Sequence, residues 1–212
     1  MRVITFAVLP ILAATAALGQ QQWEFGAVGG GGLLNNVAAA SPAGAATAGF
    51  APGLATGVFA GQNLYNHIAG EIRYEYMQSD LELSAGGQTA KFAGASHALH
   101  YDVIFHTNRS DSRTQIFGAV GGGVKAFLGT GAEEAFQPLS QYGYFTKTQS
   151  IKPMVSAGAG VSYRLKSNLF LRTEVRDFMT TFPTAVLTPA PGVKYGRFLH
   201  EVVPMVSLVY VK

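Results

Sequence analysis

The chain contains no cysteine, and charged residues make up only 13% of its 212 residues, about half the usual share. Without cysteine, neither a disulfide framework nor a lipid-anchored amino-terminal cysteine can form. The net charge of +3 is small and the basic residues are dispersed, so nucleic-acid binding has no support. Beyond the amino-terminal segment, no apolar run is long enough for a transmembrane helix. Low charge without a spanning helix therefore points to β-structure in lipid.

The amino-terminal segment has the three parts of a secretory signal peptide. A short basic start is followed by an apolar run over Val3–Leu18, and the small residues Ala17 and Gly19 stand at the −3 and −1 positions of a cleavage site. A membrane-anchor helix is the weaker alternative, because the run contains a proline and is shorter than the ~20 residues that a span requires. We predict a signal peptide over residues 1–19 and a single barrel domain over 20–212.

Two segments, 70–76 and 169–178, carry charges of alternating sign at every second position. The charged positions are Glu71, Arg73 and Glu75 in the first segment and Arg172, Glu174 and Arg176 in the second. Because successive side chains of a strand point to opposite faces, the residues between them form a face of aromatic or branched side chains. The two faces of such a strand need two different environments. A closed barrel with hydrocarbon outside and a packed polar interior meets that need.

Eight strands can be placed along the chain, joined by alternately long and short connections. The predicted strands are Trp23–Gly31, Phe50–Gly61, Ala69–Ser79, Ala95–His106, Gln115–Leu128, Lys152–Leu165, Leu169–Met179 and Phe198–Val211. The short connections are Gln62–His67, Thr107–Arg113 and Lys166–Asn168, and the long ones are Leu33–Gly49, Asp80–Gly94, Gly129–Ile151 and Thr180–Arg197. This alternation is typical of outer-membrane barrels, whose long loops face outside the cell. The sequence predicts an all-β fold, an eight-stranded antiparallel up-and-down transmembrane β-barrel.

Several segments resemble OmpA-like outer-membrane barrels. The segments are Gly49–Gly61 and Ala69–Tyr74, similar to their second and third strands, Leu171–Phe178, similar to the seventh, and His200–Lys212, similar to the closing strand. The resemblance implies a small barrel in the bacterial outer membrane, with the closing strand recognised by the barrel-insertion machinery. Family members usually end on an aromatic residue, whereas here Val211 and Lys212 follow Tyr210.

Ten polar side chains project onto one face of the third to seventh predicted strands. They are Glu71, Arg73, Glu75, His100, Asp102, Lys125, Arg164, Arg172, Glu174 and Arg176. Buried charges must be paired, and both signs are present, so we expect an ion-pair network that fills the lumen. A gated proton or ion path is the alternative, but an eight-stranded barrel has no room for an open solute channel.

Metal binding and catalysis have little support in the sequence. His97 and His100 differ in strand parity and cannot chelate one ion, although His100 and His106 share a face. Ser207 and His200 are seven residues apart, about 23 Å along a strand, so they cannot form a hydrogen-bonded nucleophile and base. We expect no enzyme activity, catalytic residue, metal or cofactor.

The function predicted from these features is structural, or an interaction at the cell surface through the four long loops. The loop aromatics at 142–145 and Phe182 are open to two interpretations, an adhesive surface or packing near the outer rim. Expected partners are outer-membrane lipid, lipopolysaccharide and the insertion machinery, and the loop partner is not defined. The alternative function is a conduit for small apolar or ionic solutes across the outer membrane.

Overall fold

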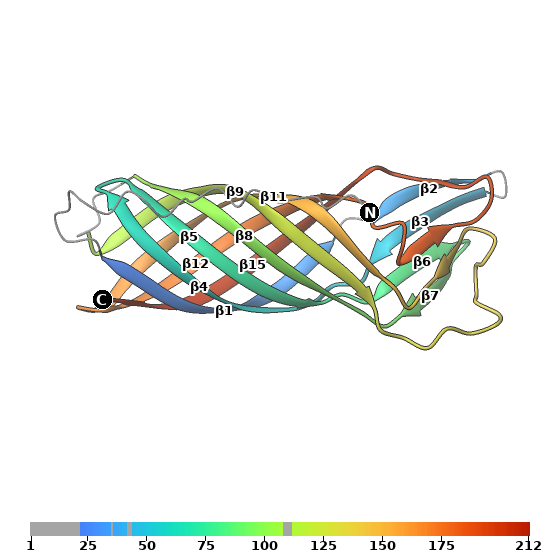
Figure 1. Cartoon of the computed structure of the whole chain (residues 1–212), viewed down its shortest axis with the longest axis horizontal. Helices are drawn as coiled ribbons and strands as arrows, with labels where there is room; N and C mark the ends of the chain where they lie inside the picture. The colour runs from blue at the N-terminus through green and yellow to red at the C-terminus, as the bar shows by residue number, and fades with distance from the viewer. Residues whose placement is uncertain (1–21, 35, 42–43, 108–111) are drawn as a thin grey trace, which may run out of the picture.

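The structure is a computed structural model and describes residues 22–34, 36–41, 44–107 and 112–212. The predicted signal peptide, residues 1–19, lies outside the described residues. Within them all the regular structure is β-strand, arranged as a barrel with a smaller β-structure at one end (Figure 1). No helix in this part of the chain is long and apolar enough to cross a membrane.

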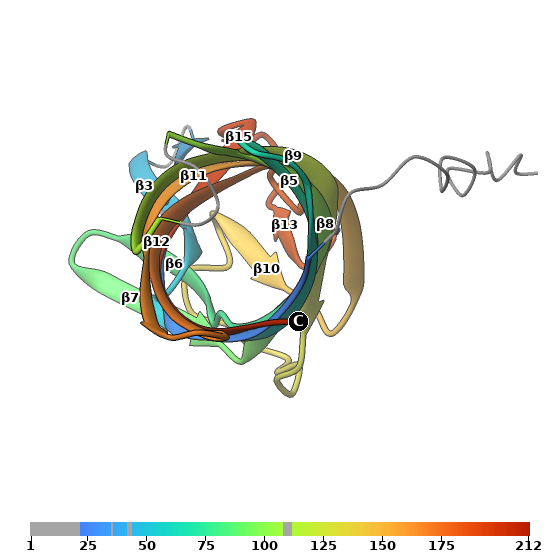
Figure 2. The same ribbon diagram turned by 90° about the vertical axis from the view of Figure 1, so that its left-hand side faces the viewer.

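Eight strands form the barrel wall. They are β1 (Trp23–Leu34), β4 (Gly53–Tyr65), β5 (Ile68–Gln78), β8 (Gly94–His106), β9 (Thr114–Gly129), β11 (Gln149–Lys166), β12 (Leu169–Thr181) and β15 (Phe198–Val211). Each pairs antiparallel with its neighbours in the order β1-β15-β12-β11-β9-β8-β5-β4, and β1 closes the ring against β4. Figure 2 shows this ring along its axis. The predicted eight-stranded antiparallel barrel is confirmed.

The wall has an apolar outer face and an inner face of buried side chains. On β11, Val155 and Val161 are 49% and 39% exposed, whereas their inward-facing neighbours Ser156 and Ser162 are 0% and 3% exposed. The same alternation on the other strands exposes a belt of Val, Ile, Leu, Phe and Tyr around the barrel. An apolar belt of this kind matches the hydrocarbon of a bilayer.

The connections between barrel strands alternate as predicted. The strand ends that the short connections join, 65 and 68, 106 and 114, and 166 and 169, lie at the same end of the barrel as Trp23 of β1 and Val211 of β15. There Lys212 N donates to Trp23 O at 2.9 Å. The predicted start of the second strand is wrong. Phe50 ends another strand and β4 begins only at Gly53, because Pro52 has no N–H with which to continue a ladder.

The four long connections are not loops alone, and the expectation of loops there needs correction. They contain β2 (Val37–Ser41), β3 (Gly44–Phe50), β6 (Leu81–Ala85), β7 (Gln88–Phe92), β10 (Gly143–Phe145), β13 (Leu187–Pro189) and β14 (Lys194–Tyr195). These strands form a five-stranded sheet, β14-β2-β3-β6-β7, and a two-stranded sheet, β10-β13. We call the two sheets and their connections the cap; it lies beyond one end of the barrel (Figure 1).

The cap has a hydrophobic core of its own, to which all four long connections contribute. Leu83 and Leu187 are fully buried in it, and the Phe92 and Phe145 rings stack with centroids 5.6 Å apart. Phe127 of β9 and Leu199 of β15 belong to the same cluster. The core therefore continues from the cap into the end of the barrel.

Three of the four loop aromatics singled out from the sequence pack in this core, whereas Tyr144 is 43% exposed. Tyr142, Phe145 and Phe182 are buried. Tyr195 packs edge-on against Phe182 and donates its hydroxyl to Tyr142 O at 3.0 Å. Burial raises the pKa of the Tyr195 phenol. Packing near the outer rim, one of the two interpretations, therefore describes Tyr142, Phe145 and Phe182.

Candidate functional site

The two strands with alternating charges face each other across the lumen. In the ring order, three strands separate β5 from β12 in either direction, so they are diametrically opposed. Their charged side chains point inward, and all six are buried. Charges of opposite sign therefore meet in the middle of the barrel, and the six charged side chains of β5 and β12 form one cluster.

Three arginines tie the cluster together. Arg73 Nη1 lies 2.6 Å from Glu174 Oε1 on the opposite strand and 3.2 Å from Glu75 Oε1 on its own. Its Nε donates to Glu71 Oε1 at 2.9 Å. Arg176 Nε donates to Glu174 Oε2 at 2.9 Å, and its Nη2 lies 3.2 Å from Glu71 Oε1. Each guanidinium thus contacts carboxylates from both sides of the lumen.

The third arginine extends the cluster toward the end with short connections. Arg172 Nη1 donates to Glu71 Oε2 at 2.7 Å, and its Nη2 donates to Glu24 Oε2 of β1 at 2.9 Å. The Arg172 guanidinium also lies over the Phe59 and Phe117 rings, 5.0 and 5.1 Å from their centroids. A planar guanidinium can donate to carboxylates at its edge and stack on rings with its face, which suits this crowded position.

Two further pairs involve the other predicted residues. His100 Nδ1 lies 2.9 Å from Asp102 Oδ2, and Asp102 also pairs with Arg176. Lys125 pairs with Glu201, and its ammonium lies 5.3 Å from the centroid of the Phe127 ring. The Lys125–Glu201 pair thus lies next to the apolar cap core, and within the described residues no ion pair joins it to the arginine cluster.

Glycines on the inner face make room for these side chains. A methyl group at Gly158 would lie 2.7 Å from Cγ of Arg176, and one at Gly160 would lie 2.6 Å from the Phe117 ring. At Gly123 it would lie 2.6 Å from Cβ of His100. Because these distances are shorter than van der Waals contact, the large inward side chains fit only where their cross-strand neighbours have no side chain.

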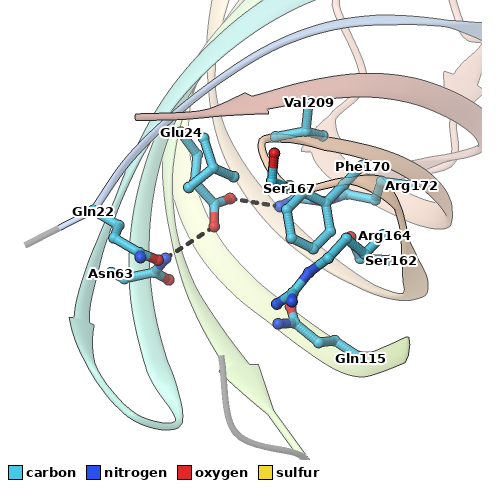
Figure 3. A pocket seen from close by; sticks show the side chains of 11 residues that line it. Gln22, Glu24, Asn63, Gln115, Ser162, Arg164, Ser167, Phe170, Arg172 and Val209 are labelled. Atoms are coloured by element: carbon cyan, nitrogen blue, oxygen red, sulfur yellow. Dashed lines mark hydrogen bonds and ion pairs between the residues drawn. The ribbon is translucent and has the colours of Figure 1, made fainter. Parts of the chain in front are cut away.

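A cavity of about 270 Å³ lies at the barrel end that carries the short connections. Its polar lining includes Glu24, Asn63, Gln115 and Arg164, and Asn63 Nδ2 donates to Glu24 Oε1 at 3.0 Å (Figure 3). Arg164 is only half-buried and stacks on Phe170 at 5.2 Å. Among the ten predicted lumenal residues it alone is not fully buried, because it lies at this open end.

The structure thus brings the ten predicted residues onto the inner face, but sequence reasoning missed two carboxylates. Glu24 and Glu201 were outside the predicted set, yet they pair with Arg172 and Lys125. Strand parity could have found both residues. Glu24 is four residues before the inward Val28, and Glu201 is two residues before the inward Val203.

The histidines do not gather around one point. His97 faces outward and bonds the Tyr74 hydroxyl through Nδ1 at 2.7 Å, whereas His100 and His106 are buried inside. No group of three or more potential metal ligands occurs among the described residues. The expectation that His97 and His100 face opposite sides is confirmed.

Comparison with solved structures places the chain among small outer-membrane barrels. Neisserial surface protein A matches with a TM-score of 0.53 at 11% identity, over 91% of this chain and 99% of that protein. Outer membrane protein OprG from Pseudomonas aeruginosa matches with a TM-score of 0.53 at 11% identity, over 89% and 93% of the two chains. No family model and no curated protein matches the sequence.

At this identity the likeness concerns the fold. A closed eight-stranded antiparallel barrel with an apolar belt is the architecture of outer-membrane proteins, and the chain is one of them. The predicted location in the bacterial outer membrane therefore holds. Membership of the OmpA-like family stays a prediction.

Proposed function

We propose that this protein is a closed outer-membrane barrel that holds a folded interaction surface, the cap, outside the cell. In this proposal the barrel is an anchor without catalytic activity. The observation that carries the proposal is the shared core: the long connections pack on one another and on Phe127 and Leu199 of the barrel wall. Ordering four connections on one core gives a surface of fixed shape, which is what specific recognition requires.

The lumen contents support an anchor rather than a pore. The arginine cluster fills one section of the interior, and an apolar layer that includes Met77, Phe178 and Val203 fills the section nearer the cap. Replacing Arg73 and Arg176 together with alanine gives the matched open variant. We expect no stepwise ionic conductance for the wild type in planar bilayers, and frequent steps of single-channel size for the wild type would contradict the closed lumen.

The orientation of the cap can be tested directly because the chain has no cysteine. We expect a membrane-impermeant maleimide to label Ala135→Cys in the cap on intact cells. Asn66→Cys, in a short connection at the other end, should react only after the outer membrane is permeabilised. Both positions are exposed, so the difference reports sidedness. Labelling of Asn66→Cys in sealed cells would reverse the proposed topology.

Outer-membrane lipid, lipopolysaccharide and the insertion machinery are the partners proposed for the barrel itself. The apolar belt supports contact with acyl chains. The closing strand β15 supports recognition by the insertion machinery, because its outward face carries Val206, Leu208 and Tyr210, all about half exposed. Deleting Val211 and Lys212 would restore an aromatic ending. We expect this deletion to leave insertion unchanged or improve it, as judged by the heat-modifiable folded fraction in membranes.

A conduit for small apolar molecules is the second candidate. An outer groove of about 470 Å³ is lined by Gly29, Pro204 and other residues of β1, β11, β12 and β15. Next to it, Pro204 and Val203 have no partners on β1, although the register on both sides is continuous. The conduit predicts that Gly29→Leu, which fills the groove, slows uptake of an apolar dye by cells, whereas a closed anchor predicts no effect.

A further inference from the structure

The cap sheet ends in a strand with a free edge. β7 is the last strand of the five-stranded sheet, and in the part of the chain that the structure describes it pairs with no strand other than β6. The β6–β7 hairpin projects beyond the outline of the barrel in the view along its axis (Figure 2). Its two-residue turn, Gly86–Gly87, has positive φ at both positions, the geometry of a tight hairpin.

The register decides which backbone groups of β7 point away from β6. In a two-residue hairpin the residues that flank the turn form a hydrogen-bonded pair, here Ala85 and Gln88. Hydrogen-bonded and non-hydrogen-bonded pairs then alternate along an antiparallel ladder. Thr89 and Lys91 therefore fall in non-hydrogen-bonded pairs, and their N–H and C=O groups point outward from the sheet edge.

The chain itself uses this edge at only one end. Ala93 is two residues after Lys91, so its carbonyl also points outward from the edge. This carbonyl oxygen accepts from Thr130 N at 2.8 Å and from Gly131 N at 3.1 Å. The segment after Gly131 then leaves the edge. Among the described residues, no hydrogen bond joins the outward backbone groups of Thr89 or Lys91 to another segment.

A groove follows the unused part of the edge. It has a volume of about 410 Å³ and lies between residues 89–93 and residues 131–138. Its apolar floor includes Phe92 and Phe145, whose stacked rings belong to the cap core. Glu134 is exposed on the far wall. The groove thus combines the outward N–H and C=O groups of Thr89 and Lys91 with an apolar floor and a carboxylate.

We propose that this groove binds an extended peptide segment of a partner protein, which adds a strand to β7. The free N–H and C=O groups of Thr89 and Lys91 would pair with a strand of about four residues, and alternate side chains would point toward the floor. An apolar residue fits against Phe92, and a Lys or Arg fits beside Glu134. The inference rests on the proposed surface role and names the class of partner and the edge that it uses.

The test is selection of a random hexapeptide library, displayed on phage, against the full barrel in lipid nanodiscs. Four variants interpret the selected peptides, two at the edge strand and two in the loop that forms the far wall of the groove. Lys91→Pro removes one outward N–H, and proline is tolerated at such edge positions because the lost donor faces solvent. Lys91→Ala is its matched control, since it keeps the N–H and loses only the ammonium. Ala132→Trp fills the groove without altering β7, and Ala135→Trp adds the same bulk at an exposed position outside the lining.

We expect peptides with alternating apolar residues and a basic residue. Lys91→Pro and Ala132→Trp should weaken them by about tenfold or more, the effect of losing one or two hydrogen bonds and their contacts. Lys91→Ala and Ala135→Trp should bind as the wild type does. In an added strand every second backbone N–H points toward β7. N-methylation of those peptide nitrogens should abolish binding, whereas N-methylation of the nitrogens between them should not.

Other results would overturn the inference. One such result is that no peptide is enriched, and another is that the selected peptides bind Lys91→Pro and Ala132→Trp as tightly as the wild type. Insensitivity to N-methylation, or pairing of two barrels through β7 in place of peptide binding, would also overturn it. Retained protease resistance of the cap would show that Lys91→Pro is folded. If the peptide-binding inference fails while Ala135→Cys is still labelled from outside the cell, the proposed surface role stands. The two proposals therefore fail separately.

Discussion

At the scale of single residues, the stability of the barrel depends on charges that have no access to bulk water. Arg73 is fully buried and lies within ion-pair distance of Glu71, Glu75 and Glu174. Removing it leaves Glu75 without an ion-pair partner among the described residues, whereas Glu71 and Glu174 keep their contacts to the other two arginines. A buried pair contributes little relative to a well-packed apolar core, but breaking one by deleting a partner is costly.

We therefore expect Arg73→Met to destabilise the folded barrel by about 3–5 kcal/mol. Lys166→Ala, at an exposed position where β11 ends, should change stability by no more than about 0.5 kcal/mol. The measurement is the urea midpoint of unfolding in lipid vesicles. Equal midpoints for the two variants would mean that the cluster is hydrated and contributes nothing as a buried network.

Two glycines allow the same substitution to be compared on the two faces of the wall. A methyl group at Gly123 would overlap the Leu99 carbonyl and lie 2.6 Å from Cα of His100, whereas one at Gly29 would meet nothing within 4 Å. We expect Gly123→Ala to cost about 1–3 kcal/mol by overpacking. Gly29→Ala should be neutral or stabilise by up to about 1 kcal/mol, since the unfolded chain loses freedom. The same unfolding assay checks both, and the reverse order would refute the inward assignment of Gly123.

At the scale of elements, the cap core should be separable from the barrel wall. Leu83 is fully buried between β6 and the rest of the cap. We expect Leu83→Ala to destabilise the cap by about 2–5 kcal/mol. Amide hydrogen exchange would then accelerate in β2, β3, β6 and β7 and stay slow in β5 and β12. Uniform acceleration in barrel and cap would show instead that the two unfold as one unit.

The barrel strands could be predicted from the sequence, whereas the cap strands could not. Over 71–75 in β5 and 172–176 in β12, charged side chains alternate with aromatic or branched ones, which is the pattern of a strand with two different faces. By contrast, β2 reads Val-Ala-Ala-Ala-Ser and β3 reads Gly-Ala-Ala-Thr-Ala-Gly-Phe, with too little contrast between faces to show a period of two. Partner choice across the lumen was also out of reach, because Arg73 and Glu174 meet only once the ring order places β5 opposite β12.

At the scale of the whole molecule, every conclusion depends on which face of the wall meets lipid. Val161 and Ser162 are neighbours on β11 and point to opposite sides, 39% and 3% exposed. An arginine at an outward site would destabilise both a membrane barrel and a soluble barrel turned inside out, so stability does not discriminate. A spin label on a single introduced cysteine does, because molecular oxygen concentrates in lipid and a charged nickel chelate stays in water.

We expect the label at Val161→Cys in vesicles to relax strongly with oxygen and weakly with the chelate. Ser162→Cys should respond weakly to both, since its side faces a packed interior, and Ala135→Cys in the cap should respond to the chelate. These three responses follow from one arrangement: hydrocarbon outside, ion pairs inside and a folded cap in water. Strong chelate relaxation at Ser162→Cys without an oxygen effect at Val161→Cys would mean a water-filled lumen and no lipid at the outer face, and the outer-membrane anchor would have to be abandoned.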